Sequence, residues 1–252
     1  MWFDLFTTDT EAAKNFYAKV AGWKAVPFGE LDPGYQMFMS GDVPVGGVST
    51  LKKEKVSQSI PAHWLGFVAV EDVNKTATRA KEMGGTIAKE PWDIASVGRI
   101  AVILDPQGGA LGIFTPEKEG ESIDASSPLG RFAWSELAAE DGEWAYNYYR
   151  DLLGWLDSDV MEMGPAGTYR MFKVEGMEKA AGGIYSKSKE LPHTAWLYYI
   201  TVAELDASVK TVKSEGGKVL NGPMDVPGGG RICQCLDPQG VAFALFQAAS
   251  AE

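Results

Sequence analysis

Two segments of the chain carry apolar side chains at the spacing of an amphipathic helix. In residues 10–21 the apolar positions are Ala13, Phe16, Tyr17 and Val20. In residues 142–153 they are Ala145, Tyr148, Tyr149 and Leu152. Both sets fall at i, i+3, i+4 and i+7, which places each set on one helix face. Thr8 or Asp9 can cap the first helix, and Gly22 and Gly154 follow the two segments as helix-ending residues.

A strand pattern followed by a second helical pattern occupies the middle of each half. The apolar helix positions are Val73, Ala77 and Ala80 in the first half, and Leu205, Val209 and Val212 in the second. Each of the four helices is followed by short strand candidates separated by Gly or Pro, as in KAVPF, YQMFM and VGGVSTL. The sequence therefore predicts an α+β protein built from four βαβββ modules. One module has an open sheet, so two must pair to close a core, within a half, across halves or between chains.

The two halves of the chain are an internal repeat. Residues 3–23 recur as 135–155, residues 63–73 as 195–205, and residues 98–114 as 230–246, all at one constant offset. The segment between the halves is polar, acidic and Ser-rich and ends in Pro and Gly, which is linker composition. We therefore predict one domain over residues 1–117, a linker over 118–129 and a second domain over 130–252.

Charge and composition narrow the classes of function. The 252-residue chain has 34 acidic and 23 basic side chains, and a net charge of −11 disfavours nucleic acids and anionic membrane surfaces. No apolar run approaches the roughly 20 residues of a membrane-spanning helix, and the amino terminus lacks a signal-peptide pattern. Cys233 and Cys235 share one strand face, and we expect them to be reduced packing residues. We therefore expect a cytoplasmic monomer or homodimer whose partner is a small molecule.

Three repeated motifs resemble those of a known family. They are the helix signature NFYAKVAGW/NYYRDLLGW, the GG pairs that end the second helix of each half, and the turn LDPQG before the last strand. This combination resembles the vicinal-oxygen-chelate superfamily, which includes glyoxalases, bleomycin-resistance proteins and extradiol dioxygenases. The resemblance implies two glyoxalase-like domains with cup-shaped mixed sheets. It leaves the reaction open, because this fold hosts several enzyme activities and drug-binding proteins.

The resemblance also locates the positions at which metal-dependent members hold a divalent ion. They correspond to Trp2, Gly66 and Gly112 in the first half, and to Trp134, Tyr198 and Ala244 in the second. Trp, Gly and Ala supply no ligating side chain, and a neutral Tyr is a poor ligand for a hard cation. We therefore expect no metal and no other cofactor. The glutathione-binding Arg of glyoxalase I is replaced by Phe6 and Ala138, and neither half has the iron triad of the extradiol dioxygenases.

Strand alternation predicts which side chains line each cup. In the first half they are Trp2, Asp4 and Phe6, then Trp64, Gly66 and Val68, then Ala110, Gly112 and Phe114. In the second half they are Trp134, Glu136 and Ala138, then Trp196, Tyr198 and Ile200, then Ala242, Ala244 and Phe246. Each cup would have aromatic walls and one carboxylate, which is typical of a small-molecule site. The eight Trp residues could equally fill the cores.

Four charged residues and two histidines are candidates for chemistry. Asp4 and Glu136 lie among aromatic residues, so each can act as a general acid or base, bind a ligand amine or hydroxyl, or form a structural pair. Arg99 and Arg231 occupy equivalent places, where they clamp a substrate carboxylate, pair with Asp4 or Glu136, or form ordinary surface ion pairs. His63 and His193 precede equivalent strands, and we expect both to be exposed strand-entry residues.

Two functions remain in competition. The first is metal-free binding, that is, sequestration or sensing of an aromatic or cationic metabolite or antibiotic in the aromatic cups. The alternative is a glyoxalase- or hydroxylase-like enzyme, an isomerase or lyase that uses Asp4 or Glu136 as its general acid or base.

Overall fold

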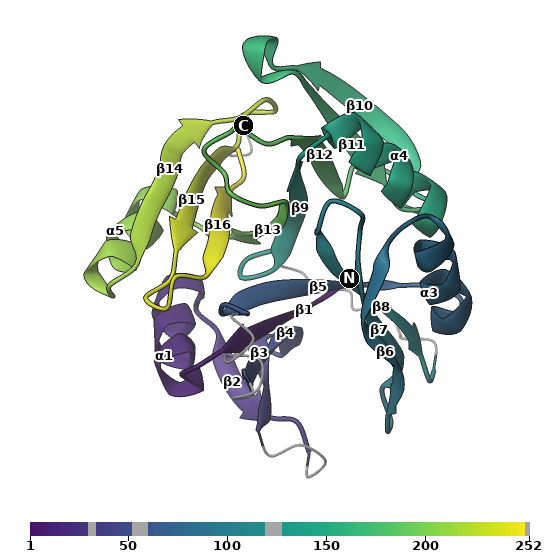
Figure 1. Cartoon of the computed structure of the whole chain (residues 1–252). Coiled ribbons are helices and arrows are strands. Elements are labelled where there is room, and N and C mark those ends of the chain that lie inside the picture. Colours follow the sequence, from purple (N-terminus) through teal and green to yellow (C-terminus); the bar gives the residue numbers. More distant parts are fainter. Residues whose placement is uncertain (30–33, 52–59, 119–127, 250–252) are drawn as a thin grey trace. The chain divides into compact units, whose positions relative to one another are not determined.

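A computed structural model describes residues 1–29, 34–51, 60–118 and 128–249 (Figure 1). Residues 119–127, which form most of the predicted linker, lie outside the described residues. The first repeat contains β1 (Trp2–Thr7), α1 (Thr10–Ala21), β2 (Lys24–Pro27), β3 (Tyr35–Ser40), β4 (Val43–Thr50), β5 (His63–Ala69), α3 (Val73–Glu82), β6 (Thr86–Ile94), β7 (Gly98–Leu104) and β8 (Ala110–Pro116).

The second repeat has the same order of elements. It contains β9 (Phe132–Ala139), α4 (Gly142–Leu153), β10 (Leu156–Glu162), a short 3-10 turn (Gly164–Ala166), β11 (Thr168–Lys173), β12 (Gly182–Ser186), β13 (Ala195–Thr201), α5 (Leu205–Ser214), β14 (Lys218–Asp225), β15 (Arg231–Leu236) and β16 (Ala242–Gln247). The four βαβββ modules are thereby confirmed, and we number them 1 to 4 along the chain. No helix in the described part of the chain is long and apolar enough to cross a membrane.

The strands form two mixed sheets of eight strands, one in each repeat. Their orders are β2-β3-β4-β1-β5-β8-β7-β6 and β10-β11-β12-β9-β13-β16-β15-β14. In each module the first strand pairs in parallel with the last, as β1 does with β4 and β13 with β16, whereas the hairpin strands pair antiparallel. The two sheets confirm the predicted α+β class.

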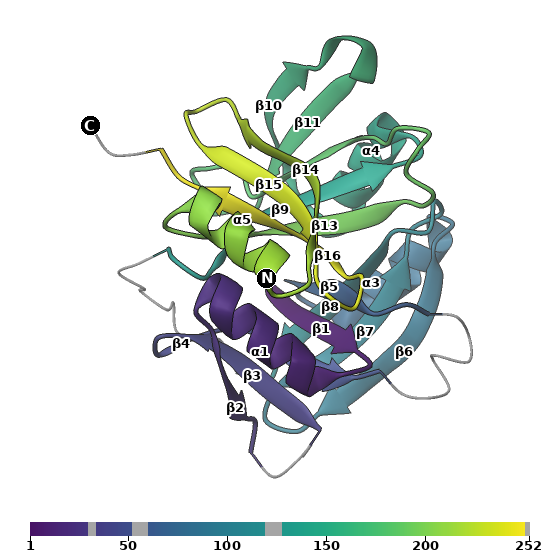
Figure 2. The same cartoon turned by 90° about the vertical axis from the view of Figure 1, so that its left-hand side faces the viewer.

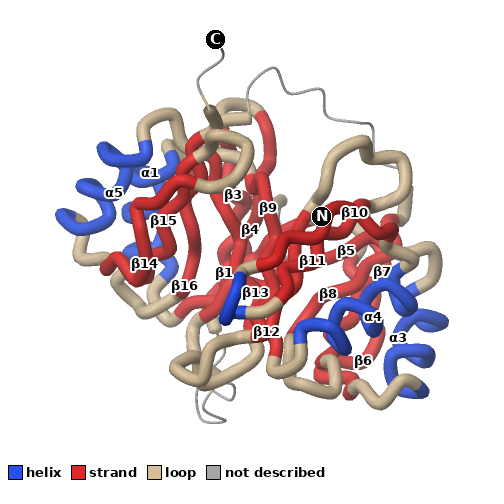
Figure 3. Tube along the Cα trace, turned by 90° about the horizontal axis from the view of Figure 1, so that it is seen from above, coloured by secondary structure: helices blue, strands red, loops and turns tan. Residues whose placement is uncertain are grey.

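The compact units of the chain combine modules from different repeats. One unit, here called unit I, joins the described parts of residues 2–65 with residues 128–133 and 198–249, so that it contains modules 1 and 4. The other, unit II, joins residues 66–118 with residues 134–197 and contains modules 2 and 3. In unit I helix α1 lies beside α5 (Figures 1 and 2), and in unit II α3 lies beside α4 (Figure 3). Strands are thus hydrogen-bonded within a repeat, whereas helices pack across repeats. The domain limits at 117 and 130 follow the repeats and stay a prediction.

An aromatic cluster fills the core beneath the helices of each unit. In unit I its members are Tyr17, Trp23, Phe38 and Trp64, and in unit II they are Tyr149, Trp155, Phe172 and Trp196. All eight side chains are buried. The indole Nε1 of Trp64 donates a hydrogen bond of 2.9 Å to the Tyr17 hydroxyl on α1. Trp64 and Trp196 therefore belong to the helix-side core. The prediction that they line the opposite face with Gly112 and Ala244 is wrong.

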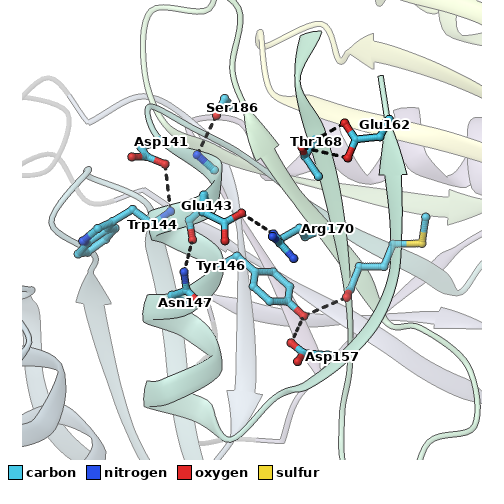
Figure 4. Close-up of polar contacts among 12 residues, drawn as sticks. Asp141, Glu143, Trp144, Tyr146, Asn147, Asp157, Glu162, Thr168, Arg170 and Ser186 are labelled. Atoms are coloured by element: carbon cyan, nitrogen blue, oxygen red, sulfur yellow. Dashed lines mark hydrogen bonds and ion pairs between the residues drawn. The ribbon is translucent and has the colours of Figure 1, made fainter. Parts of the chain in front are cut away.

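Helix α4 shows how a helix is held against its sheet (Figure 4). Asp141 caps its first turn by accepting from the amide of Trp144, and Arg170 on β11 pairs with Glu143. The Tyr146 hydroxyl donates to Asp157 on β10 at 2.8 Å. Arg170 and the buried Phe172 thus face α4. Tyr169 is the neighbour of Arg170 on β11, so alternation turns its side chain to the other side of the strand.

The LDPQG turns join the modules of each unit. In unit I Asp237 is buried and lies 3.4 Å from the hydroxyl of Tyr17, and in unit II Asp105 accepts from Tyr149 at 2.8 Å. The side-chain amide of Gln239 accepts from the backbone N–H of Asp9 at 3.0 Å and donates to its carbonyl at 2.8 Å. Gln107 makes the same two bonds with Asp141. Each turn therefore docks on the start of a helix in the other repeat.

We predict that Gln239→Ala lowers the free energy of unfolding by about 1–2 kcal/mol, because it leaves the backbone groups of Asp9 without these partners. Equilibrium denaturant unfolding measures the change. Lys210→Ala, an exposed substitution on α5 of the same unit, serves as the control. A loss no larger than that of the control would show that the turn does not hold module 1.

Candidate functional site

Alternate residues of β1 face opposite sides of its sheet. Phe3, Leu5 and Thr7 are buried, whereas Trp2, Asp4 and Phe6 are partly exposed. Strand β9 repeats this arrangement with Trp134 and Glu136 partly exposed and with Ser135 and Leu137 buried. We call the side that carries Asp4 or Glu136 the open face. The alternation expected for the two first strands is therefore present.

Asp4 is the centre of a hydrogen-bonded cluster on the open face of unit I. Its Oδ1 accepts from the indole Nε1 of Trp2 at 2.8 Å and from the hydroxyl of Tyr35 at 2.8 Å. Trp2 Nε1 also lies 3.0 Å from the Tyr35 oxygen, so the three groups contact one another. Burial raises the pKa of Asp4 to about 6, against the opposing effect of the two donors. The carboxyl group therefore titrates close to neutral pH.

Unit II contains a second copy of this cluster. Trp134 Nε1 donates to the hydroxyl of Tyr169 at 2.7 Å, and that hydroxyl donates to Glu136 Oε2 at 3.0 Å. Tyr185 on β12 stacks on Tyr169 with ring centroids 5.8 Å apart. Burial, followed by the nearby charge of Glu136, raises the pKa of Tyr185 to about 12. The arrangement of Trp, acid and Tyr is thus duplicated.

A glycine makes room for the tyrosine in each cluster. Gly47 on β4 pairs with Asp4, and a Cβ atom at Gly47 would overlap the Tyr35 hydroxyl and the Asp4 carboxylate. Gly183 on β12 pairs with Glu136, and a Cβ atom there would overlap the Tyr169 ring. The two tyrosines and two glycines were not among the residues expected from the sequence. The signal that finds them is the repeat of YQMF (35–38) as YRMF (169–172), together with the GG pair in the following strand.

The side chains of β5 and β13, the fifth strands of the two repeats, face the sides opposite to those predicted. Phe67 pairs with Gly112, and a Cβ atom at Gly112 would overlap the Phe67 ring, so these two residues share the open face. Gly66 therefore points to the helix side, as Trp64 and Val68 do. In the second repeat Tyr199 pairs with Ala244 and accepts from Gln234, whereas Tyr198 packs on Phe3 and Phe132 in the core of unit I. The prediction placed the alternation one residue too late because it set the family's fifth-strand position at Gly66 and Tyr198 and assigned the tryptophans from there.

The residues at the family's metal-ligand positions do not fit a divalent ion. The Trp2 indole is a hydrogen-bond donor and is engaged by Asp4, and Gly112 is covered by the Phe67 ring. Leu65, which shares the open face with Phe67, supplies no ligand either. Across the described residues, no group of three or more His, Cys, Asp or Glu side chains is arranged to hold a metal ion. The chain is a tandem member of its fold class that lacks the usual ligand set.

Arg99 and Arg231 pair with acids other than Asp4 and Glu136. Arg99 pairs with Asp93 on β6 at 2.8 Å and bonds Asn74 on α3, and Arg231 pairs with Asp206 on α5 at 2.9 Å. Each arginine thus pairs with an acid on a neighbouring strand or helix, as expected for an ordinary surface ion pair. Arg99 also lines two shallow grooves beside α3, of about 500 and 400 Å³, and neither is lined by a member of the Trp–acid–Tyr clusters. Phe114 and Phe246 are partly exposed at the ends of β8 and β16, paired with Ile100 and Ile232.

We predict that Tyr35→Phe raises the pKa of Asp4 above its value of about 6, because the variant removes a donor that stabilises the carboxylate. Carboxyl ¹³C NMR titration measures the midpoint, and Asp4→Asn identifies the resonance. Tyr169→Phe, the matching change in the other cluster, is expected to leave the midpoint of Asp4 unchanged. A lower midpoint in Tyr35→Phe would contradict the assigned hydrogen bond.

We predict that Gly47→Ala destabilises the protein by about 1–3 kcal/mol, because the new methyl group overlaps Tyr35 and Asp4. Adding Tyr35→Ala to Gly47→Ala should recover part of this loss, since the overlap with the ring is removed. Thermal unfolding of the single and double variants measures the coupling. Additive losses would show that Tyr35 does not cover Gly47.

Comparisons with known proteins find relatives of the whole chain and structures of similar fold. The chain is 30% identical to "Putative glyoxylase CFP32" of Mycobacterium tuberculosis (strain CDC 1551 / Oshkosh), over 98% of this chain and 94% of the relative. It is 28% identical to "Anthracycline biosynthesis protein DauV" of Streptomyces sp. (strain C5), over 98% and 92% of the two chains. Among solved structures, the Mn(II)-bound glyoxalase from Novosphingobium aromaticivorans has a similar fold, with a TM-score of 0.69 at 15% identity, covering 99% of this chain and 81% of that one.

The family model for the Glyoxalase/Bleomycin resistance protein/Dioxygenase superfamily matches residues 2–112 and 131–245, that is, both sequence repeats. The two matched ranges, the paired eight-stranded sheets and the repeated LDPQG turns all point to the same assignment. The chain belongs to the Glyoxalase/Bleomycin resistance protein/Dioxygenase superfamily.

Proposed function

We propose that the chain binds a small molecule without a metal ion, and that the ligand has a planar aromatic ring carrying an amine or hydroxyl donor. The observation that carries this proposal is the duplicated Trp–acid–Tyr cluster on the open face of each unit. In such a cluster a tyrosine hydroxyl orients the carboxylate, and the tryptophan indole lies beside it. A planar ligand would contact the indole and donate to the acid.

The hydrogen bonds of Asp4 leave one oxygen for the ligand. Both of its protein donors reach Oδ1, and within the described part of the chain no donor reaches Oδ2. An amine or hydroxyl on the ligand would supply the missing partner, and a cationic amine would also hold the carboxyl in its charged form. The net charge of −11 favours approach of a cation over that of an anion. The name of the Streptomyces relative suggests fused-ring aromatic compounds as the ligand class.

The test uses 2-naphthol, a planar ring with one donor, and 2-methoxynaphthalene, which has the same ring without the donor. We expect tryptophan fluorescence titration to detect 2-naphthol binding that survives dialysis against EDTA. Asp4→Asn combined with Glu136→Gln should weaken 2-naphthol by about tenfold, as expected when charge-assisted hydrogen bonds become neutral ones. Binding of 2-methoxynaphthalene should change little.

Asp42→Asn, in the exposed turn between β3 and β4, controls for the loss of a negative charge. Equal weakening by this variant would assign the effect to overall charge. Stoichiometric zinc, nickel, manganese or iron in the purified protein, with binding lost after EDTA, would overturn the metal-free proposal.

A second candidate function is acid–base catalysis by Asp4 or Glu136. The pKa of about 6 for Asp4 favours it, because a general acid or base is most effective when its pKa lies near the working pH. The name of the mycobacterial relative suggests a glyoxalase-like isomerase or lyase. Chromatography of the ligand after incubation separates the two functions: a ligand recovered unchanged supports binding alone. Conversion that stops in Asp4→Asn or Glu136→Gln supports catalysis.

A further inference from the structure

The two Trp–acid–Tyr clusters have different neighbours. On β1 the residue two places after the acid is Phe6, whereas the equivalent residue of β9 is Ala138. Phe6 pairs with Ser49 on β4, whereas Ala138 pairs with Tyr185 on β12. At the start of the fifth strand the first repeat has His63 and the second has Ala195. The repeat therefore preserves the acid and its donors, and it varies the side chains beside them.

His63 lies on the open face, next to Phe6. The two rings are stacked, with centroids 5.4 Å apart and planes 29° apart. His63 lies three residues before Gly66 on β5, so alternation turns the two residues to opposite faces. Because Gly66 faces the helices, His63 lies on the open face with Phe67 and Asp4. His63 and Phe6 are both partly exposed, and a ligand that contacts Asp4 along β1 next meets this stacked pair.

The hydrogen bond of His63 defines which ring nitrogen is available. Nδ1 lies 2.8 Å from the carbonyl oxygen of Pro61. A carbonyl oxygen only accepts, so Nδ1 carries the hydrogen and Nε2 keeps its lone pair in the neutral ring. Burial lowers the pKa of His63, which favours that neutral form at pH 7. Among the described residues Nε2 has no hydrogen-bond partner. It is therefore an acceptor for a ligand.

We propose that Phe6 and His63 form a subsite that makes the first repeat the selective binding site for a hydroxylated planar aromatic ligand. The ring of the ligand contacts Phe6, and a second hydroxyl, besides the donor that reaches Asp4, donates to Nε2 of His63. The second cluster has the ring of Tyr185 beside Ala138 instead of the Phe6 ring, and with Ala195 it lacks the imidazole acceptor. The chain then has two unequal sites. This inference rests on the proposed function, because it assumes that both clusters bind aromatic ligands.

The first experiment weakens the second cluster with a Glu136→Gln background, and titrates 2,7-dihydroxynaphthalene and 2-naphthol, which lacks the second hydroxyl, by isothermal calorimetry. His63→Ala should weaken the diol about three- to tenfold and weaken 2-naphthol less, because both ligands lose the ring that stacks on Phe6 and only the diol also loses an acceptor. Phe6→Ala should weaken both ligands, because it removes the stacking surface. His193→Ala, the exposed histidine of the other repeat, is the matched control and should have no effect.

The second experiment transfers the subsite. Ala138→Phe, Tyr185→Ser and Ala195→His together copy the first-repeat neighbours into the second cluster. In an Asp4→Asn background, this triple variant should bind 2,7-dihydroxynaphthalene at least threefold more tightly than the unmodified second cluster. Because this is a gain of affinity, loss of folding cannot imitate it.

The outcomes separate the two proposals. If 2,7-dihydroxynaphthalene binds with equal affinity at both clusters and is unaffected by His63→Ala, Phe6→Ala and the triple variant, the subsite is wrong and the proposed function stands. If neither naphthalene binds to the unmodified protein, the proposed function fails and the subsite fails with it. Weakening of 2-naphthol by His63→Ala to the same degree as the diol would also overturn the subsite, since the imidazole would then be packing rather than accepting.

Discussion

The docking of an LDPQG turn on a helix of the other repeat is the interaction on which the arrangement of modules depends. The turn buries a carboxylate, Asp237 or Asp105, which must find donors because an unpaired buried charge is costly. Backbone amides of the turn supply some of them, and the tyrosine hydroxyl of the facing helix supplies another. Burial still raises the pKa of Asp237. The glutamine of the same turn then pairs with the backbone at the start of that helix. A short repeated motif thereby decides that modules 1 and 4, and modules 2 and 3, share a core.

This docking also positions the candidate site. Gln239 contacts Thr7, Thr8 and Asp9, which follow directly after β1. The strand that carries Trp2, Asp4 and Phe6 is thus held at its far end by the turn, and its buried residues contact the aromatic core. The residues that alternate with these buried ones lie on the open face. The odd-numbered residues of this strand are therefore buried, whereas its even-numbered residues carry the candidate site.

Each cluster contains the tryptophan, Trp2 or Trp134, that stands at the first-strand position to which the family resemblance assigns a metal ligand. An indole at Trp2 or Trp134 cannot bind a cation through its N–H, but it can donate that hydrogen to an acid or a tyrosine. The acid two residues further along becomes the polar centre instead. Because it is surrounded by aromatic side chains, its charge is stabilised less than in water, and the pKa of Asp4 rises towards neutrality. The open face of unit I thus carries a titratable carboxyl group where no metal ligand set is present among the described residues.

Local patterns in the sequence determined the modules, the helix boundaries and the first-strand faces, because these depend on short-range periodicity and on capping residues. Asp9, Asp72 and Asp141 cap their helices, and Gly22 and Gly154 end theirs with positive φ. The same patterns also identified Asp4 and Glu136. They did not identify Tyr35 and Tyr169, whose partners lie more than 30 residues away and are reached only when β3 and β11 are placed beside the glycine strands.

Only the tertiary structure decided the faces of β5 and β13 and the pairing of the modules. A buried central strand is apolar on both sides, so hydrophobic alternation does not tell its two faces apart. The cross-strand partners distinguish the two faces. Because Phe67 lies opposite Gly112 and Tyr199 opposite Ala244, Trp64 and Trp196 face the helices. The same register brings His63 beside Phe6. The sequence by itself thus determined which residues form each element and which acids stand on the first strands. The packing of those elements decided which aromatic residues stand with the acids and which fill the core.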